Sequence, residues 1–171
     1  MANSNSLTHA SSAPSVSSPA LSIRVQSADF DLAAEFSALR AQLSRPAQTG
    51  ALVNFVGLVR DMNEGEPVSQ LSLEHYPGMS EKALQAIAAE ASARWPIQAV
   101  RVVHRVGDLA PSEQIVFVGV SAAHRQEAFA ACAFIVDQLK TRAPFWKRES
   151  TPKGSRWLDA RETDLARTEA W

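Results

Sequence analysis

The 171-residue sequence contains a single cysteine, no long apolar run and almost no net charge. One cysteine, Cys132, excludes an internal disulfide and a zinc site built from several cysteines, and it fits a reducing compartment. No apolar run approaches the roughly 20 residues that a membrane-spanning helix needs. A formal charge of −1 gives no overall field that would attract nucleic acid or a membrane surface. We therefore expect a cytoplasmic enzyme or binding protein in which any basic site is local.

Common metal and nucleotide motifs are also missing. No His/Glu spacing resembles a metal motif, and the sequence has neither a glycine-rich phosphate loop nor a Gly-x-Ser-x-Gly elbow. We therefore expect no metal site and no cofactor. Residues 1–20 are rich in serine and alanine and lack the basic start and apolar stretch of a secretory signal. We interpret 1–20 as a flexible tail and 21–171 as one domain, since this length suits a single buried core.

Hydrophobic periodicity predicts strands that alternate with helices. Strands are expected within residues 21–25, 50–60, 71–76, 100–106 and 115–120. Helices are expected after an N-cap at Asp29 or Asp31, after a cap at Ser80, and beyond Ser121. The order β-α-β-β-α-β-β-α, with hairpins between helices, predicts an α+β domain with a largely antiparallel sheet.

Three segments carry more specific expectations. Apolar residues on both faces of the 50–60 strand predict that it is covered on both sides. The charged segment 61–67, with Gly65 and Pro67, predicts a loop or hairpin connection. Residues 145–171 have little periodicity and many charges, so an irregular tail is expected there.

Basic residues are concentrated near the C-terminus, where three of the four lysines lie. The cations in this run are Lys140, Arg142, Lys147, Arg148, Lys153, Arg156 and Arg161. Only Glu149 and Asp159 oppose them. Such a local excess on a neutral chain suits a phosphate or carboxylate ligand, although a solvated surface face is the simpler interpretation of a charge run alone.

Bulky aromatic residues separate the charges between Lys140 and Glu149. Aromatic packing can hold a lysine beside apolar walls, and desolvation then lowers the pKa of its ammonium group toward neutrality. A lysine of this kind can act as an acid, a base or a nucleophile. For Lys140 alone, a cation placed favourably at a helix C-terminus is a sufficient explanation.

Two further places combine cations with backbone geometry that suits an anion. Backbone N–H groups at the start of the helix beyond Ser121, with His124 and Arg125 beside them, make a ready anion site. His124 fits a capping or packing role equally well. Arg60 ends a strand after Gly57 and can reach a ligand over the sheet edge, or it is a surface residue with a buried stem. By contrast, Cys132, His75 and His104 are expected to be structural core residues.

Four separated motifs, taken together and in order, resemble the large, catalytic subunit of the molybdopterin synthases. They are Glu74–Met79, His104–Gly107, Val118–Arg125 and Lys140–Glu149, and the resemblance runs in register from about Val25 to Trp171. It implies an α/β hammerhead-type fold and a central homodimer of large subunits. It also implies a ubiquitin-like small subunit bound to each, in a heterotetramer overall, whose C-terminal Gly-Gly thiocarboxylate delivers sulfur. The sulfur acceptor is cyclic pyranopterin monophosphate, a pterin phosphate, and the product is the dithiolene of molybdopterin.

The same resemblance assigns roles to the basic run. Lys140 is similar to the central catalytic lysine of the family and Lys147 to its partner. Arg148 and Glu149 resemble residues in the same substrate-binding wall. Arg161 resembles an arginine that reaches the site of the neighbouring subunit. Which lysine acts as the acid or base is not evident from the sequence.

The remaining substrate-binding residues follow from the other motifs. His124 and Arg125 resemble the pair that binds the pterin phosphate. Arg60, with Leu58 and Val59 before it, resembles another part of that pocket. Some relatives carry a basic residue where this chain has Leu58, so the resemblance assigns that side chain no charge-based role.

Two other functions compete with this interpretation. The first is a non-enzymatic adaptor that binds the tail of a ubiquitin-like protein, or an acidic ligand, through the same basic pocket. The second is a binder of single-stranded nucleic acid that uses Phe145, Trp146 and Trp157 as stacking platforms. The neutral net charge argues against the second, so no nucleic-acid or membrane partner is expected.

Overall fold

The computed structural model describes residues 18–171, so the tail expected over residues 1–20 lies almost wholly outside the described residues. The elements from β1 to α2 are β1 (Ala20–Gln26), α1 (Leu32–Ala41), the 3-10 turn η1 (Pro46–Gln48), β2 (Ala51–Leu58), β3 (Met62–Asn63), β4 (Glu66–Pro67), β5 (Gln70–His75) and α2 (Met79–Arg94). The elements from β6 to α4 are β6 (Ile97–Arg105), β7 (Gly107–Leu109), β8 (Gln114–Ala122), α3 (Arg125–Arg142), β9 (Phe145–Thr151), β10 (Gly154–Leu158) and α4 (Glu162–Glu169).

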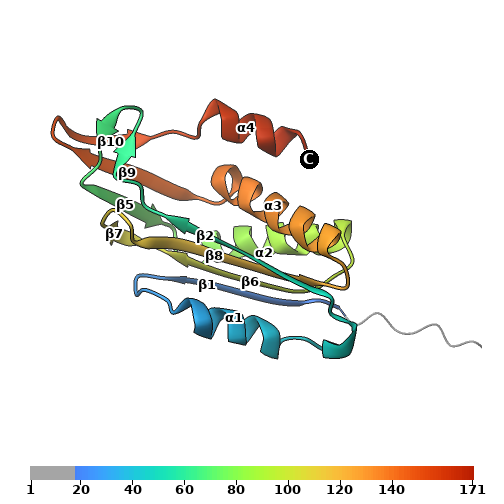
Figure 1. The fold of residues 1–171 in the computed structure, drawn as a ribbon. Helices are drawn as coiled ribbons and strands as arrows, with labels where there is room; N and C mark the ends of the chain where they lie inside the picture. The colour runs from blue at the N-terminus through green and yellow to red at the C-terminus, as the bar shows by residue number, and fades with distance from the viewer. Residues whose placement is uncertain (1–17) are drawn as a thin grey trace, which may run out of the picture.

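The strands form two four-stranded sheets and one small hairpin (Figure 1). The first sheet has the order β1-β6-β8-β2, in which β1 and β6 are parallel and the other neighbours are antiparallel. The second has the order β10-β9-β5-β7 and is antiparallel throughout. The expected α+β class with largely antiparallel pairing is therefore confirmed. Strands β2 and β5 belong to different four-stranded sheets, and the β3–β4 hairpin connects them along the chain.

Helices cover both faces of the first sheet. In Figure 1, α1 lies on one face, α2 and α3 lie on the other, and α4 lies over α3. Because successive side chains of a strand point to opposite faces, Val118 and Val120 of β8 pack in the core under α2 and α3. Phe117 points the other way and packs edge-on against Phe30, beside α1. This two-sided cover explains the nearly continuous apolar sequence of β8.

The strand predicted over residues 50–60 is covered on both faces, but only in part. Val53 packs against the core under α2 and α3, and Val56 packs on the other face against the cluster that contains Phe117. Strand β2 is the edge strand of the first sheet, paired with β8 alone. The side chains of Phe55 and Leu58 are 38% and 52% exposed. Part of the apolar surface of this edge strand is therefore exposed.

Helix termini follow local sequence signals with one exception. The Asp31 carboxylate accepts a hydrogen bond from the backbone N–H of Ala34 at 2.7 Å, which confirms an N-cap there. The predicted cap at Ser80 is wrong, because α2 begins at Met79 with Gly78 as its N-cap. Ser80 lies inside the helix, is buried, and its hydroxyl donates to the carbonyl of Pro144 at 3.2 Å. Pro144 disfavours helix at Ala143, where α3 has its C-cap.

The expected irregular tail over residues 145–171 is also wrong. It forms β9, β10 and α4. Charged and aromatic residues occupy both faces of β9, so no apolar alternation marks it, and its pairing with β5 and β10 stabilises it as a strand. The eight-residue α4 is held by contacts with α3, including Thr168 with Thr141 and Asp164 with Lys140. Across residues 18–171, no helix has the length and apolarity needed to cross a membrane.

Candidate active site

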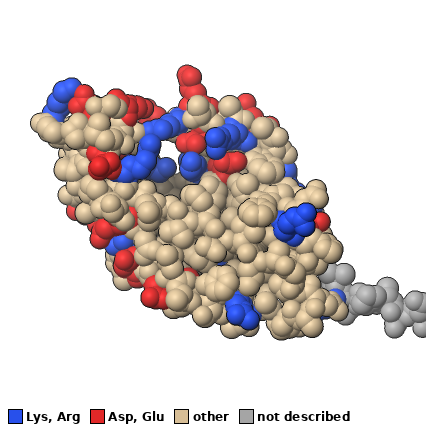
Figure 2. Space-filling view, in the orientation of Figure 1, with Lys and Arg blue, Asp and Glu red and all other residues tan. Residues whose placement is uncertain are grey.

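A cavity of about 670 Å³ lies where the end of β2, strand β9, the C-terminal part of α3 and helix α4 meet. Its charged lining is mainly basic. The cations are Arg60, Lys140, Lys147, Arg161 and Arg167, and the carboxylates are Glu149, Asp159 and Asp164. Figure 2 shows Lys and Arg side chains gathered around a hollow on this face, below α4. The local excess of cations suits an anionic ligand.

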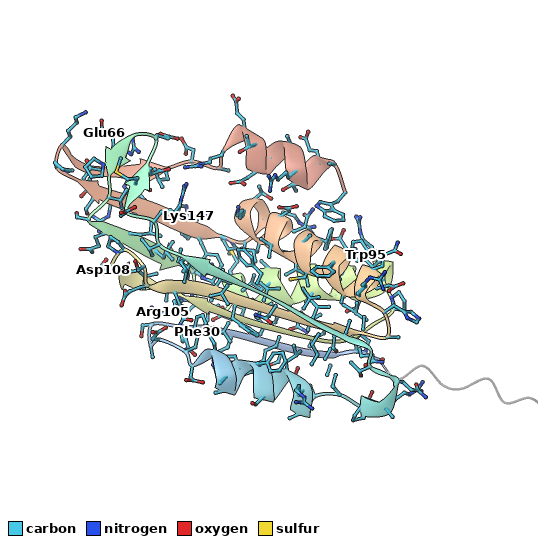
Figure 3. The ribbon with its side chains drawn as sticks, viewed as in Figure 1. Phe30, Glu66, Trp95, Arg105, Asp108 and Lys147 are labelled. Atoms are coloured by element: carbon cyan, nitrogen blue, oxygen red, sulfur yellow. The ribbon has the colours of Figure 1, made fainter. Side chains whose placement is uncertain are left out.

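The two lysines reach the cavity from consecutive elements. Lys140 lies in the last turn of α3, and the chain then turns at Ala143–Pro144 into β9, which carries Lys147. The Nζ atom of Lys140 lies 3.3 Å from Oδ1 of Asp164. Figure 3 shows Lys147 projecting from β9 into the space between β9 and α4. Burial lowers the pKa of Lys147, and the nearby charges of Lys140 and Arg161 lower it further while Asp164 opposes them.

A neutral histidine forms part of the wall beside Lys147. The ring of His104 is buried and stacks on Phe145 with the ring centroids 3.9 Å apart. Its Nδ1 lies 2.7 Å from the carbonyl oxygen of Arg105, so this nitrogen carries the proton and Nε2 is left as an acceptor. Burial lowers the pKa of His104 to about 4. His104 therefore lines the cavity as an uncharged, oriented ring at neutral pH, in addition to the core role expected for it.

A buried amide and a buried carboxylate connect the arginines of the cavity. Asn63 Nδ2 donates to both oxygens of Glu149, at 2.8 and 3.0 Å. Asn63 Oδ1 accepts from Nη2 of Arg60 at 3.4 Å and from Nη2 of Arg161. Arg156 donates to Glu149 Oε2 at 3.3 Å. The network joins the end of β2, the β3–β4 hairpin, strands β9 and β10, and the start of α4.

The structure brings most of the predicted site residues together and leaves three outside. The cavity is lined by Leu58, Val59, Arg60, Lys140, Lys147, Glu149 and Arg161. Arg161 resembles an arginine that reaches the site of the neighbouring subunit, and here it lines the cavity of its own chain. Arg148 points to the opposite face of β9, where its guanidinium lies 5.5 Å from the centre of the Trp157 ring. His124 and Arg125 are exposed at the N-terminal end of α3. Since Lys140 lies 16 residues further along that helix, the two ends are roughly 24 Å apart at 1.5 Å per residue.

Besides His104, the polar residues Asn63, Asp164 and Arg167 line the cavity without having been predicted from the sequence. Asn63 was part of a segment interpreted only as a connection, and nothing local distinguishes its amide from that of a surface hairpin residue. Asp164 and Arg167 lie three residues apart on α4, which places them on one helix face. That spacing was the available signal, and it is informative only once residues 162–169 are known to be helical.

Cys132 is not a candidate nucleophile. It is buried in the core under α3, and burial raises the pKa of its thiol to about 12. At neutral pH it is therefore a protonated, apolar core side chain. Over residues 18–171, no three side chains of His, Cys, Asp or Glu are grouped so that they could hold a metal ion.

Known proteins are similar to this chain over most of its length. The family model described as MoaE protein matches residues 25–142. The chain belongs to the MoaE protein family. The molybdopterin synthase catalytic subunit of Vibrio cholerae is 55% identical over 149 residues, which cover 87% of this chain and 97% of that protein. The resemblance drawn from the four sequence motifs is thereby confirmed.

Solved structures of the MoaE family share the fold described above. The molybdopterin biosynthesis MoaE protein of Burkholderia ambifaria matches with a TM-score of 0.74 at 56% identity, covering 88% of this chain and 97% of that one. A molybdopterin synthase structure from Staphylococcus aureus matches with a TM-score of 0.71 at 29% identity, covering 79% and 95% of the respective chains. The basic cavity of this chain therefore lies in a MoaE-type domain.

Proposed function

We propose that this chain is the catalytic subunit of a molybdopterin synthase and acts in molybdenum cofactor biosynthesis. In this reaction it transfers sulfur from the thiocarboxylated C-terminus of a small subunit to cyclic pyranopterin monophosphate, and the product carries the dithiolene of molybdopterin. The observation that carries the proposal is the desolvated Lys147 beside Lys140 in a cavity ringed by arginines. The family membership and the names of the relatives support the same activity.

The proposed reaction brings two anions together. The thiocarboxylate and the phosphate repel each other, and clustered cations in a partly enclosed cavity offset that repulsion. Sulfur of the thiocarboxylate then forms a bond to a pterin carbon, and the oxygen that it replaces leaves with a proton. A lysine positioned in the cavity can supply that proton. Water hydrolyses the resulting thioester, so the bond between the sulfur and the carbonyl carbon of the small subunit breaks and the small subunit leaves as a carboxylate.

The two lysines differ in environment, and we assign them different tasks. Lys147 is the better proton donor, because burial lowers its pKa toward the pH at which an acid works efficiently. Lys140 is more exposed and is paired with Asp164 at 3.3 Å. It provides a positive charge for the incoming thiocarboxylate, which takes the place of the Asp164 carboxylate as its partner.

A second copy of the chain completes the site in this proposal. His124 and Arg125 are assigned to the pterin phosphate, yet within one chain they lie at the other end of α3 from Lys140. A ligand of pterin size cannot contact both ends of an 18-residue helix, which is about 27 Å long. The central homodimer brings the pair from one copy to the lysines of the other. Isologous two-fold symmetry produces two such sites.

The small subunit and the compartment follow from the same proposal. The relatives are named as catalytic subunits, which supports a further, sulfur-carrying subunit for this chain. We expect the C-terminal Gly-Gly tail of that subunit to enter the cavity. A cytoplasmic location suits both the thiol chemistry and the single, reduced Cys132.

A single-turnover assay tests the reaction. Purified chain, thiocarboxylated small subunit and cyclic pyranopterin monophosphate are mixed, and molybdopterin is measured as its fluorescent oxidised derivative. Wild type is expected to form product, while Lys140→Ala forms little and still binds the small subunit. The matched control is Lys82→Ala, which removes an exposed lysine on α2 and should leave turnover unchanged. Binding of the small subunit without product from wild type would favour the adaptor function instead.

A further inference from the structure

Asn63 links two of the cavity's arginines, Arg60 and Arg161, to a buried carboxylate. Its side chain is enclosed, with only 5% of the residue exposed. One end of the amide donates to both oxygens of Glu149, and the other end accepts from Arg60 and Arg161. Arg60 follows β2 and Arg161 precedes α4, so one side chain connects segments 101 residues apart.

Asparagine is chemically suited to this position. A carboxylate accepts hydrogen bonds and guanidinium groups donate them, so the connecting residue needs a donor on one side and an acceptor on the other. An amide has both in a fixed geometry. Reversing the amide would place its oxygen against Glu149 and its nitrogen against two cations, so the charges on either side determine its orientation.

The hairpin that carries Asn63 is itself held in place. Glu64 and Gly65 both have positive φ, at 53° and 80°, in the tight turn between β3 and β4. Beside the turn, the N–H of Val68 donates to the carbonyl of Asp61 at 2.8 Å. Glu64 forms an ion pair with Arg156, the same arginine that donates to Glu149. Asn63 is therefore a fixed point to which the longer and more mobile arginine side chains are attached.

Glu149 serves mainly to anchor this amide. Its two oxygens accept three hydrogen bonds from protein groups, two from Asn63 and one from Arg156. A carboxylate bound in this way has little capacity left for a ligand, and its charge would repel an anionic one. Its effect on the substrate therefore passes through Asn63 to Arg60 and Arg161.

We propose that Asn63 is a positioning residue that holds the guanidinium groups of Arg60 and Arg161 toward the phosphate of the pterin substrate. The inference rests on the proposed function for the identity of the ligand. It predicts a loss of substrate affinity, rather than of the chemical step, when the donor–acceptor order of the network is broken. It also predicts that affinity returns when that order is restored by a second substitution.

The test exchanges amide and carboxylate groups within the network. Asn63→Asp keeps the size of the side chain and faces Glu149 with a second carboxylate. The double variant Asn63→Asp/Glu149→Gln restores one donor and one acceptor at the contact with an unchanged total charge. Glu66→Gln is the control, since it alters an exposed ion pair on the same hairpin. Binding of cyclic pyranopterin monophosphate is measured by calorimetry, and KM and kcat are measured with the small subunit present.

The expected result is a rise of about tenfold in Kd and KM for Asn63→Asp, with a smaller change in kcat. The double variant should recover most of that loss, and Glu66→Gln should match wild type. A general loss of folded protein would instead lower kcat at constant KM. The proposal is overturned if Asn63→Asp binds the pterin within roughly twofold of wild type, or if the double variant is no better than the single one.

The same measurements separate this inference from the proposed function. If wild type turns over and Asn63→Asp behaves like it, only the role of Asn63 is wrong. If wild type binds the pterin and forms no product, the proposed function is wrong and the Kd comparison decides the role of Asn63. If wild type does not bind the pterin, both are wrong.

Discussion

The location of His124 and Arg125 leads to a prediction about mixed dimers. Lys140→Ala removes a lysine from the cavity, and Arg125→Ala removes a cation from the distant end of α3. Each variant alone should be inactive in the proposed reaction. If the phosphate-binding pair comes from the second copy, a dimer of one Lys140→Ala chain and one Arg125→Ala chain has one intact site. Its other site lacks both residues.

The size of the recovery follows from the separation along the helix. Residues 125 and 140 are 15 positions apart on α3, which corresponds to about 22 Å. Both residues therefore act on one substrate only if they come from different copies. A two-fold dimer has two equivalent sites, so the mixed dimer should show about half of wild-type turnover. The alternative, a site formed within one chain, predicts no turnover because each chain then lacks one required residue.

The assay uses two affinity tags, one on each variant, and tandem purification of the mixed dimer after co-expression. Single-turnover formation of molybdopterin is then compared with both parent variants and with wild type. A mixed dimer of Lys140→Ala and Lys147→Ala is the control, since both lysines line the same cavity and neither site is intact. Purified mixed dimers of Lys140→Ala and Arg125→Ala that are no more active than their parents would refute the shared site.

Three further predictions concern titration and burial. Burial lowers the pKa of Lys147, so turnover should fall with rising pH below the ordinary lysine range. Lys147→Arg, which stays charged but is too weak an acid to donate the proton, should turn over far more slowly and without this alkaline limb in the pH–rate profile. An unchanged limb in that variant would exclude Lys147 as its source. Burial lowers the pKa of His104 to about 4, so between pH 6.5 and 4 the unfolded chain binds a proton at this histidine and the folded chain does not. As the pH falls from 6.5 to 4, the free energy of unfolding should therefore decline by up to about 3 kcal/mol. Urea titrations at both pH values should show a smaller decline for His104→Phe, and equal declines would contradict the burial of an uncharged ring. The thiol of Cys132, with its pKa raised to about 12, should react with a thiol reagent at pH 8 only after denaturation, and rapid labelling of the native chain would contradict its core position.

Local signals were sufficient for the parts of the fold that depend on short-range physics. The Asp31 cap, the end of α3 before Pro144 and the valine-rich strands β6 and β8 are all recognisable from neighbouring residues. Capping, the restriction before proline and side-chain alternation act over a few positions along the chain. The Ser80 cap failed for the same reason, because Gly78 with its positive φ was an equally local competitor.

The C-terminal part of the chain depends on contacts that no local pattern contains. Strand β9 has charged residues on both faces, and it is a strand because β5 and β10 pair with it. Helix α4 is eight residues long, which is too short for independent stability in water, and its contacts with α3 maintain it. Its Asp164 consequently reaches Lys140, a pairing between residues 24 positions apart.

The sequence by itself determined which chemical groups are available and roughly where helices and strands begin and end. Its motifs also identified the MoaE family, because they preserve the types and order of those groups. Only the tertiary structure decided which groups meet: it placed Lys140 and Lys147 in one cavity, turned Arg148 away from it, and left His124 and Arg125 at the far end of α3. It also enclosed Asn63 between Glu149 and two arginines. Burial, desolvation and hydrogen-bond partners are properties of the folded chain, since they depend on residues that are distant in sequence and adjacent only after folding.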